Sequence, residues 1–407
     1  MGVVAASSGR RVLALVVVLA ALAGAACDGG PGEGPIASSS APAPVELGAA
    51  LVAAGGYHSC ALDEGGAASC WGLGEYGQLG TGGTEGSDVP VAVAMPDGVT
   101  FTELAPGNAH TCALAADGAV WCWGVDGDGI HDAQGNDAHG PRLVRFPGDV
   151  VATSLDGYYH VCAADTSGGA WCWGRDTEGQ LGNGSTIDSV APVAVRVPDG
   201  ASFTRVAAGG YHSCALDADG AAWCWGQDLR GQLGDGDGQR DRSVPGAVTM
   251  PSGVTFVTIT AGFDHTCALD ASGGAWCWGD GSSGQLGDGG SADAPVPVAV
   301  TMPDGVTFVS IDAGNAHTCA VASDGAVWCW GLGPQGGAAT TDVVAAPTRV
   351  AIGEGLAAVV VSAGGFHTCA LTSDGRAWCW GDGSTGQLGV GAVAGATLPT
   401  PVVGWDA

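Results

Sequence analysis

Fourteen of the fifteen cysteines form seven pairs, and the two members of each pair are separated by ten positions. A histidine precedes every pair in the pattern His-x-Cys-x9-Cys, so residues capable of chemistry recur as a set. Each set could supply three metal ligands, one disulfide, or two packed thiols beside a histidine. The pairs are Cys60 and Cys70, Cys112 and Cys122, Cys162 and Cys172, Cys214 and Cys224, Cys267 and Cys277, Cys319 and Cys329, and Cys369 and Cys379.

The constant spacing favours disulfides. A short turn with Asp-Gly or Gly-Gly lies between the two cysteines, as at Asp324-Gly325. If Cys60 faces Cys70 across such a turn, then Leu62 faces Ala68, and directly opposed residues of an antiparallel pair lie about 4.5–5.5 Å apart at Cα. We therefore expect a disulfide within every pair, formed in an oxidising compartment. Reduced, packed cysteines are the alternative.

A metal site is disfavoured by the same pattern. His317, Cys319 and Cys329 would have to converge on one side of a sheet, and the chain would hold seven equal sites. We expect no metal and no cofactor.

The seven repeated histidines follow a glycine-rich bend, and we expect a hydrogen bond from each to anchor that bend. A ring of histidines lining a channel is the alternative. Catalysis is disfavoured, because seven copies of one pattern give seven similar environments, whereas an active site brings unlike residues together. The histidines are His58, His110, His160, His212, His265, His317 and His367.

From about residue 46 onward the chain consists of seven repeats of about 50 residues. One unit contains strand candidates at 307–312, 317–321 and 326–330, and a Pro/Val segment such as 295–300 provides the fourth. Six units read Trp-Cys-Trp-Gly in the third candidate, which indicates packing of tryptophan between neighbouring units. Four strands per repeat predict an all-β, seven-bladed propeller of four-stranded antiparallel blades, and a linear solenoid is the alternative.

The repeat resembles a known family. The pattern AGxxHTCAL, DGxxWxWG and GQLG is similar to the regulator-of-chromosome-condensation (RCC1) repeat, and it covers residues 46–407. GQLG occurs at 77–80, 179–182, 231–234, 284–287 and 386–389, and it is missing from repeats 2 and 6. The resemblance implies a seven-bladed propeller. The family includes a nucleotide exchange factor, a plant ultraviolet photoreceptor and bacterial inhibitors of secreted enzymes, so the resemblance does not fix a function.

The charge balance excludes several classes of function. The chain has 12 basic residues, all arginine, against 41 acidic residues, for a net charge of −29. Such a chain repels phosphates, so we expect neither nucleic-acid binding nor attraction to anionic lipid. Without lysine, Schiff-base and Walker-lysine chemistry are impossible.

The N-terminus predicts export. Residues 1–26 have the organisation of a signal peptide, and residues 27–45 form a Gly/Pro/Ser-rich tether. Gly24-Ala25-Ala26-Cys27 resembles a bacterial lipobox with Gly24 in place of the usual leucine. We expect an exported protein of the cell envelope, with Cys27 lipidated as its only link to the membrane. Plain cleavage of the signal peptide, which would give a secreted protein, is the alternative.

The lipobox resemblance predicts that the mature chain begins at Cys27 and carries lipid. Mass spectrometry of the N-terminus of the native protein measures both properties. A start at another residue, or an unmodified Cys27, would contradict the expectation.

Function is expected where the repeats differ. Repeat 2 replaces GQLG by residues 125–140, with His131 and His139, and repeat 4 carries the acidic run 235–242. Both segments weakly resemble calcium loops but lack the full ligand spacing. The arginines within and beside them make these loops candidates for protein binding, and they are Arg142, Arg145, Arg240 and Arg242. We expect a non-enzymatic, monomeric propeller that binds a protein partner; an exchange factor and a polysaccharide-binding or polysaccharide-cleaving protein are the alternatives.

Overall fold

A computed structural model describes residues 49–125, 138–333, 343–392 and 394–405. They belong to one compact unit, residues 46–407. This part of the chain is all β, and within it no helix is long and apolar enough to cross a membrane. The predicted segments 1–26 and 27–45, with Cys27, lie outside the described residues.

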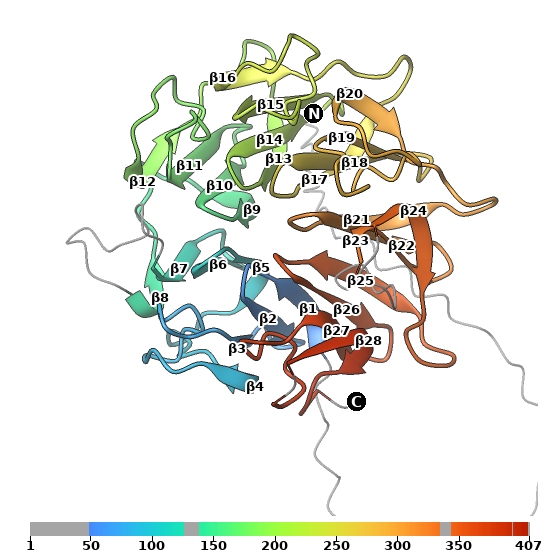
Figure 1. The fold of residues 1–407 in the computed structure, drawn as a ribbon. Coiled ribbons are helices and arrows are strands. Elements are labelled where there is room, and N and C mark those ends of the chain that lie inside the picture. The colour runs from blue at the N-terminus through green and yellow to red at the C-terminus, as the bar shows by residue number, and fades with distance from the viewer. Residues whose placement is uncertain (1–48, 126–137, 334–342, 393, 406–407) are drawn as a thin grey trace, which may run out of the picture. The chain divides into compact units, whose positions relative to one another are not determined.

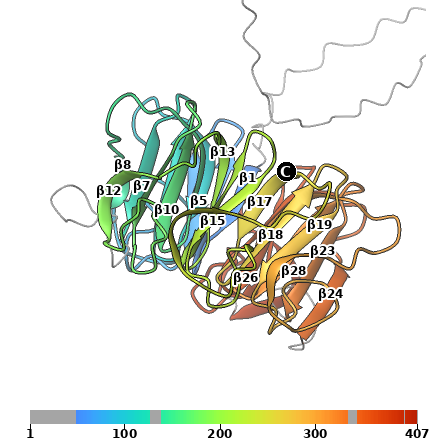
Figure 2. The ribbon, with the colours of Figure 1, turned by 90° about the horizontal axis from the view of Figure 1, so that it is seen from above.

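Seven four-stranded antiparallel sheets surround a central axis, which confirms the predicted seven-bladed propeller (Figures 1 and 2). Each sheet is built from one continuous repeat, so the ring closes where blade 7 meets blade 1 without exchange of a strand. The first strand of each blade lies nearest the axis and the fourth lies at the rim (Figure 1).

The observed strands lie within two residues of those expected from the repeat. The strands of blades 1 to 3 are β1 (Ala49–Ala54), β2 (His58–Asp63), β3 (Ala68–Gly72), β4 (Ser87–Ala92), β5 (Phe101–Pro106), β6 (His110–Ala115), β7 (Val120–Gly124), β8 (Ala138–Leu143), β9 (Ala152–Gly157), β10 (His160–Asp165), β11 (Ala170–Gly174) and β12 (Ser189–Ala194). Those of blades 4 and 5 are β13 (Phe203–Ala208), β14 (His212–Asp217), β15 (Ala222–Gly226), β16 (Arg242–Ala247), β17 (Phe256–Ala261), β18 (His265–Asp270), β19 (Ala275–Gly279) and β20 (Ala294–Ala299). Those of blades 6 and 7 are β21 (Phe308–Ala313), β22 (His317–Ala322), β23 (Val327–Leu332), β24 (Val343–Val350), β25 (Ala358–Ala363), β26 (His367–Thr372), β27 (Ala377–Asp382) and β28 (Gly395–Pro401).

The second and third strands of each blade form a hairpin around its cysteines. Cys60 pairs with Cys70 and Leu62 with Ala68, which is the register that the ten-residue spacing predicts. All seven cysteine pairs are bonded within their own hairpins, with Cα atoms 4.0–4.1 Å apart. This Cα separation is slightly shorter than the expected 4.5–5.5 Å, and the pairing is the expected one in every blade: Cys60 with Cys70, Cys112 with Cys122, Cys162 with Cys172, Cys214 with Cys224, Cys267 with Cys277, Cys319 with Cys329, and Cys369 with Cys379. The cysteines are at most 4% exposed, so the sulfur atoms are part of the packing between blades.

In the five blades that contain it, the GQLG loop contacts the next blade. The carbonyl oxygen of Gln78 in blade 1 accepts a hydrogen bond from Nε1 of Trp123 in blade 2, at 2.8 Å. Gly80 follows with a φ of 69°, and a Cβ there would lie 2.7 Å from Nε1 of Trp123. Blades 3, 4, 5 and 7 repeat the contact between glutamine and tryptophan. The last glycine of the motif thus lets the loop approach the neighbouring tryptophan.

Each repeated histidine with an assigned hydroxyl partner is bonded to the following blade. Nε2 of His212 in blade 4 lies 2.9 Å from Oγ1 of Thr266 in blade 5. That hydroxyl donates its proton to the carbonyl oxygen of Gln232, so Nε2 must be the donor. Burial lowers the pKa of His212 to about 3, so the imidazole is neutral. His58, His160, His265, His317 and His367 make the same contact with a serine or threonine, while blade 3 has Val161 at the hydroxyl position.

These histidines are at most 1% exposed and do not line a channel. For six of the seven, the side-chain hydrogen bond joins two blades and does not anchor the histidine's own bend as expected, because the neighbouring strand presents a hydroxyl there.

The innermost strands are joined by a second set of contacts. The Asp312 carboxylate in blade 6 accepts hydrogen bonds from Oγ1 of Thr260 in blade 5 and from the Ala363 amide in blade 7, at 2.7 and 2.8 Å. The Ala54 amide of blade 1 donates to Oγ of Ser362 in blade 7, at 3.0 Å. Side-chain acceptors on the first strand therefore tie three successive junctions, including the closing one.

Candidate functional site

Two kinds of loop lie at the same end of the propeller. The bend between the first and second strands and the loop between the third and fourth strands share one end, because successive strands are antiparallel. We call this end the loop face. The hairpin turns and the connections between blades form the opposite face.

Six aromatic residues gather where the bends meet around the axis. We call them the mouth cluster: Tyr57, Tyr158, Tyr159, Tyr211, Phe263 and Phe366. Five blades contribute, and every ring is half-buried. Ring centroids are 5.0 Å apart for Tyr158 and Tyr159 and 5.6 Å apart for Tyr57 and Phe366. All six ring contacts are edge-to-face or tilted: five join Tyr158, Tyr159, Tyr211 and Phe263, and the sixth joins Tyr57 to Phe366. The cluster therefore consists of a packed group of four rings and a pair of rings rather than a flat platform.

Polar contacts hold this cluster in place. The guanidinium of Arg175 lies 4.9 Å from the ring centre of Tyr211 and 5.9 Å from that of Tyr159. The Tyr158 hydroxyl of blade 3 donates to Oδ1 of Asn315 in blade 6, at 2.8 Å, a contact between blades that are not neighbours. Burial raises the pKa of Tyr158, so this hydroxyl stays protonated.

Two carboxyl groups near the axis are strongly affected by burial. Desolvation raises the pKa of Asp156 to about 7, although the amides of Ala208 and Gly157 donate to it. Desolvation also raises the pKa of Glu103 to about 7, and the positive charge of Arg205 opposes that rise. Both groups belong to first strands of neighbouring blades and titrate near neutral pH.

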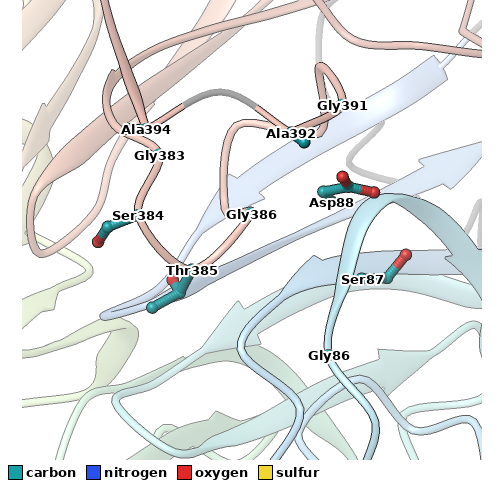
Figure 3. A pocket seen from close by; sticks show the side chains of 10 residues that line it. All are labelled: Gly86, Ser87, Asp88, Gly383, Ser384, Thr385, Gly386, Gly391, Ala392 and Ala394. Atoms are coloured by element: carbon teal, nitrogen blue, oxygen red, sulfur yellow. The ribbon is translucent and has the colours of Figure 1, made fainter.

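A pocket of about 660 Å³ opens where blade 7 meets blade 1 (Figure 3). Blade 1 contributes Gly86, Ser87 and Asp88, and blade 7 contributes residues between 383 and 394. All other lining residues are glycine, alanine, serine or threonine, so the Asp88 carboxylate is the single charged group among them.

The four candidate arginines do not form one surface. Arg242 begins β16 and Arg240 lies two positions before it, on the loop face of blade 4. Arg142 lies near the end of β8 and Arg145 follows that strand, so both are toward the opposite face of blade 2. Blade 3 separates the two pairs. The sequence placed them in neighbouring irregular segments but could not show that a fourth strand runs from one face to the other.

Two carboxylates of the acidic run of blade 4 pair with an arginine of the same run. The Arg242 guanidinium contacts the carboxylates of Asp235, at 2.6 Å, and of Asp237. Asp228 is close to both carboxylates, and its two oxygens accept the amides of Leu233 and Arg240. Two of the carboxylates that resemble a calcium loop in the sequence therefore contact an arginine of the same segment. Residues 126–137, with His131, lie outside the described residues, whereas His139 is the second residue of β8.

Comparison with protein families identifies the fold. The profile of the RCC1-like domain matches residues 188–406, more than half of the chain. The chain belongs to the RCC1-like domain family. RCC1-repeat profiles also match residues 66–114 and the segments 50–78, 102–130 and 150–180, so the RCC1-like match extends through both halves of the chain.

Two curated relatives show the range of RCC1-like proteins. The chain is 32% identical to the ultraviolet-B receptor UVR8 of Arabidopsis thaliana over 296 residues, which are 69% of this chain and 64% of the receptor. It is 30% identical to the E3 ubiquitin-protein ligase HERC2 of Homo sapiens over 64% of this chain and 4% of the ligase. The chain thus spans less than two thirds of these relatives.

Solved structures show the same fold. Human WBSCR16 aligns with a TM-score of 0.75 and 22% identity, covering 83% of this chain and 94% of that one. Yeast RCC1 (Prp20), solved in complex with Kap60, aligns with a TM-score of 0.73 and 24% identity, covering 82% and 83%.

The mouth cluster was not predicted from the sequence. Every member lies one or two positions before a repeated histidine, so the signal was present in the register of the repeats. Blades 2 and 6 have Asn108-Ala109 and Asn315-Ala316 at these positions, and they are also the repeats that lack GQLG. Only the closed ring shows that the other five blades bring their aromatic rings together.

Proposed function

We propose that this RCC1-like chain is an exported, non-enzymatic propeller that binds a protein partner through its loop face. The mouth cluster carries the proposal. The repeated histidines, tryptophans and cysteines pack between blades. The residues of the mouth cluster, in contrast, differ from blade to blade and are partly exposed to solvent. Aromatic and arginine side chains are those most often found at binding hot spots.

The related proteins support protein binding in general terms. Yeast RCC1 (Prp20) was solved bound to Kap60, and its binding to Gsp1p and histones has been described. The ligase activity in the name of HERC2 belongs to a protein of which this chain matches 4%. We propose export and a lipid on Cys27 from the sequence of the N-terminal segment. We propose a monomeric state because the ring of blades is closed.

The loop face is tested by partner capture from the native cell envelope with purified wild-type and variant propellers. We expect the double variant with Tyr159→Ala and Tyr211→Ala to weaken binding to the captured protein about tenfold or more, because truncation of central aromatic anchors typically has such effects. Affinity measured for the isolated partner gives the number.

The matched control is the double variant with Val257→Thr and Val309→Thr on the opposite face. These valines are 55% and 62% exposed, and blades 2 to 4 carry threonine at the corresponding positions, so the change preserves the fold. Equal loss in both variants, or loss in the control alone, would place the binding surface elsewhere. Capture of a glycan or a GTPase in place of another protein would favour the alternative functions.

A further inference from the structure

The pocket between blades 7 and 1 has hydrogen-bond acceptors but few available donors. The amides of Gly383, Gly386 and Gly391 donate to the carbonyl oxygens of Ala394, Gly383 and Asp88. The amides of Ser384 and Thr385 donate to the side chains of Asp382 and Gln387. These five lining amides are therefore engaged within the protein.

The hydroxyl protons of the lining residues are engaged as well. The Ser87 hydroxyl donates to the carbonyl oxygen of Val89, at 2.6 Å, and the Ser384 hydroxyl donates to the Asp382 carboxylate, at 2.9 Å. The Thr385 hydroxyl lies 2.7 Å from Oε1 of Gln387 and 3.1 Å from the carbonyl oxygen of Tyr57. What these groups can offer a ligand are oxygen lone pairs.

Asp88 adds a negative charge to this set of acceptors. Its side chain is half-buried on β4, and no arginine or lysine lines the pocket. In Figure 3 the Asp88 carboxylate and Ser87 hydroxyl belong to blade 1, and the loop of blade 7 with Ser384 to Gly386 forms the facing wall. A ligand that carries positive charge and several N–H donors complements this lining.

The pocket adjoins the mouth cluster. Thr385 lines the pocket and contacts the carbonyl oxygen of Tyr57, while the Asp382 amide donates to the carbonyl oxygen of Phe366, at 2.9 Å. The loop of blade 7 therefore connects the pocket with the Tyr57–Phe366 ring pair. Arg175 already shows that rings of this cluster accept a guanidinium, and among the described residues no cation lies over the Tyr57–Phe366 pair.

We propose that the junction of blades 7 and 1 binds a basic segment of the partner protein, with an arginine or lysine side chain entering the pocket against Asp88. The pocket volume is within the usual range for ligand sites, about 300–1,000 Å³. The net charge of −29 attracts basic segments over a longer range. This inference depends on the proposed protein-binding function and assigns a chemistry to its partner.

Binding of a fluorescent hexa-arginine peptide tests the site, with anisotropy measured at about 150 mM salt to screen distant charges. We expect Asp88→Asn to weaken binding about tenfold, because a partly buried carboxylate opposite a cation contributes more than an exposed one. The control Asp97→Asn removes the same charge from an exposed position in the same blade, on the opposite face, and should change affinity less than about twofold. A photoreactive peptide should crosslink to residues 86–88 or 383–392.

Equal effects of the two substitutions would show that the peptide responds only to net charge, and the site would be wrong. Displacement of the peptide by neutral cellohexaose, with no effect of Asp88→Asn, would indicate a glycan surface and would also overturn it. Unchanged thermal unfolding of Asp88→Asn shows that the fold is intact. If an isolated partner requires Tyr159 and Tyr211 but binds Asp88→Asn normally, the proposed function holds and this site fails. If Asp88→Asn loses peptide binding but no protein partner is captured, the site holds and the proposed function fails.

Discussion

Acidification from about pH 6.5 to about pH 5 will lower the free energy of unfolding of this propeller through its buried histidines. Burial lowers the pKa of His58, His160, His212 and His317 to about 3 and that of His265 and His367 to about 4. The unfolded chain takes up these protons below about pH 6.5, whereas the folded chain does not. The stability from neutral histidine is therefore complete above that pH and is lost as the pH falls toward the folded-state value.

The geometry explains why the charged form is excluded. Nε2 of His212 already donates to Thr266, and no described residue accepts a hydrogen bond from Nδ1. An imidazolium would carry a second N–H without a partner inside a dry interface. At about pH 5 each such histidine costs roughly 2 kcal/mol relative to neutral pH. Six of them together approach the whole stability of an ordinary domain, about 5–15 kcal/mol.

Denaturant unfolding of His212→Gln at about pH 7.5 and about pH 5 isolates the effect. The variant is destabilised at the higher pH, and its deficit against wild type should shrink by roughly 2 kcal/mol at the lower pH, because it has no proton to take up there. The matched control Thr266→Val removes the hydroxyl but keeps the histidine, so its deficit, about 1–2 kcal/mol, should be similar at both values. A deficit of His212→Gln that does not change with pH would contradict the assignment.

Carboxyl groups with a raised pKa act in the opposite direction, and among the described residues they are Glu103, Asp156, Asp176, Asp228, Asp264 and Asp312. The pKa of Asp156 and that of Glu103 are raised to about 7 by desolvation, so protonation on acidification favours the folded state until the unfolded carboxyl groups also take up protons. The total pH dependence of wild type is therefore smaller than the histidines alone would give. The difference between His212→Gln and wild type removes this background, since both proteins contain the same carboxyl groups.

The sequence was sufficient for the architecture and for contacts within one blade. The ten-residue spacing of Cys60 and Cys70 sets the register of their hairpin, because in an antiparallel pair one contact determines its neighbours. The turn residues and the period of the repeat locate the strands. These are local features, and they are visible wherever the repeat is aligned with itself.

Contacts between blades could not be derived in the same way. His212 and Thr266 are separated by 54 positions, and the sequence alone does not show that these two side chains meet rather than His212 and its own bend. The pairing of Arg242 with Asp235 depends on how one loop folds back, which the sequence does not show. Arg242 was therefore predicted to bind a partner, whereas its guanidinium pairs with a carboxylate of the same chain. The Tyr57–Phe366 pair of the mouth cluster and the pocket beside Asp88 exist only once blade 7 has met blade 1.

Removal of one hairpin disulfide will destabilise the propeller by roughly 2–3 kcal/mol in the chain-entropy model for a loop of this length. The double variant with Cys214→Ala and Cys224→Ala tests this in blade 4, where Cys214 and Cys224 are fully buried. The sulfur atoms pack at the interface with the next blade, since Sγ of Cys214 lies 3.8 Å from Oγ1 of Thr266, so loss of packing adds to the effect. Denaturant unfolding under non-reducing conditions gives the difference, and a change well below 1 kcal/mol would contradict it.

Full reduction is expected to have the largest effect on this protein. Because the cysteines are at most 4% exposed, reductant reaches them only when blades separate, so native protein should react slowly with dithiothreitol and rapidly once denaturant is added. The stabilisation by the seven disulfides need not be additive. Their joint loss should nevertheless lower the free energy of unfolding by more than about 5 kcal/mol and prevent refolding until the thiols are reoxidised. Non-reducing peptide mapping should find each cysteine from Cys60 to Cys379 joined to the partner ten positions away and none joined to another blade. Mostly free thiols in the native protein, or stability unchanged by reductant in denaturant, would show instead that the cysteines act as packed thiols and that the interface between blades carries the stability without them.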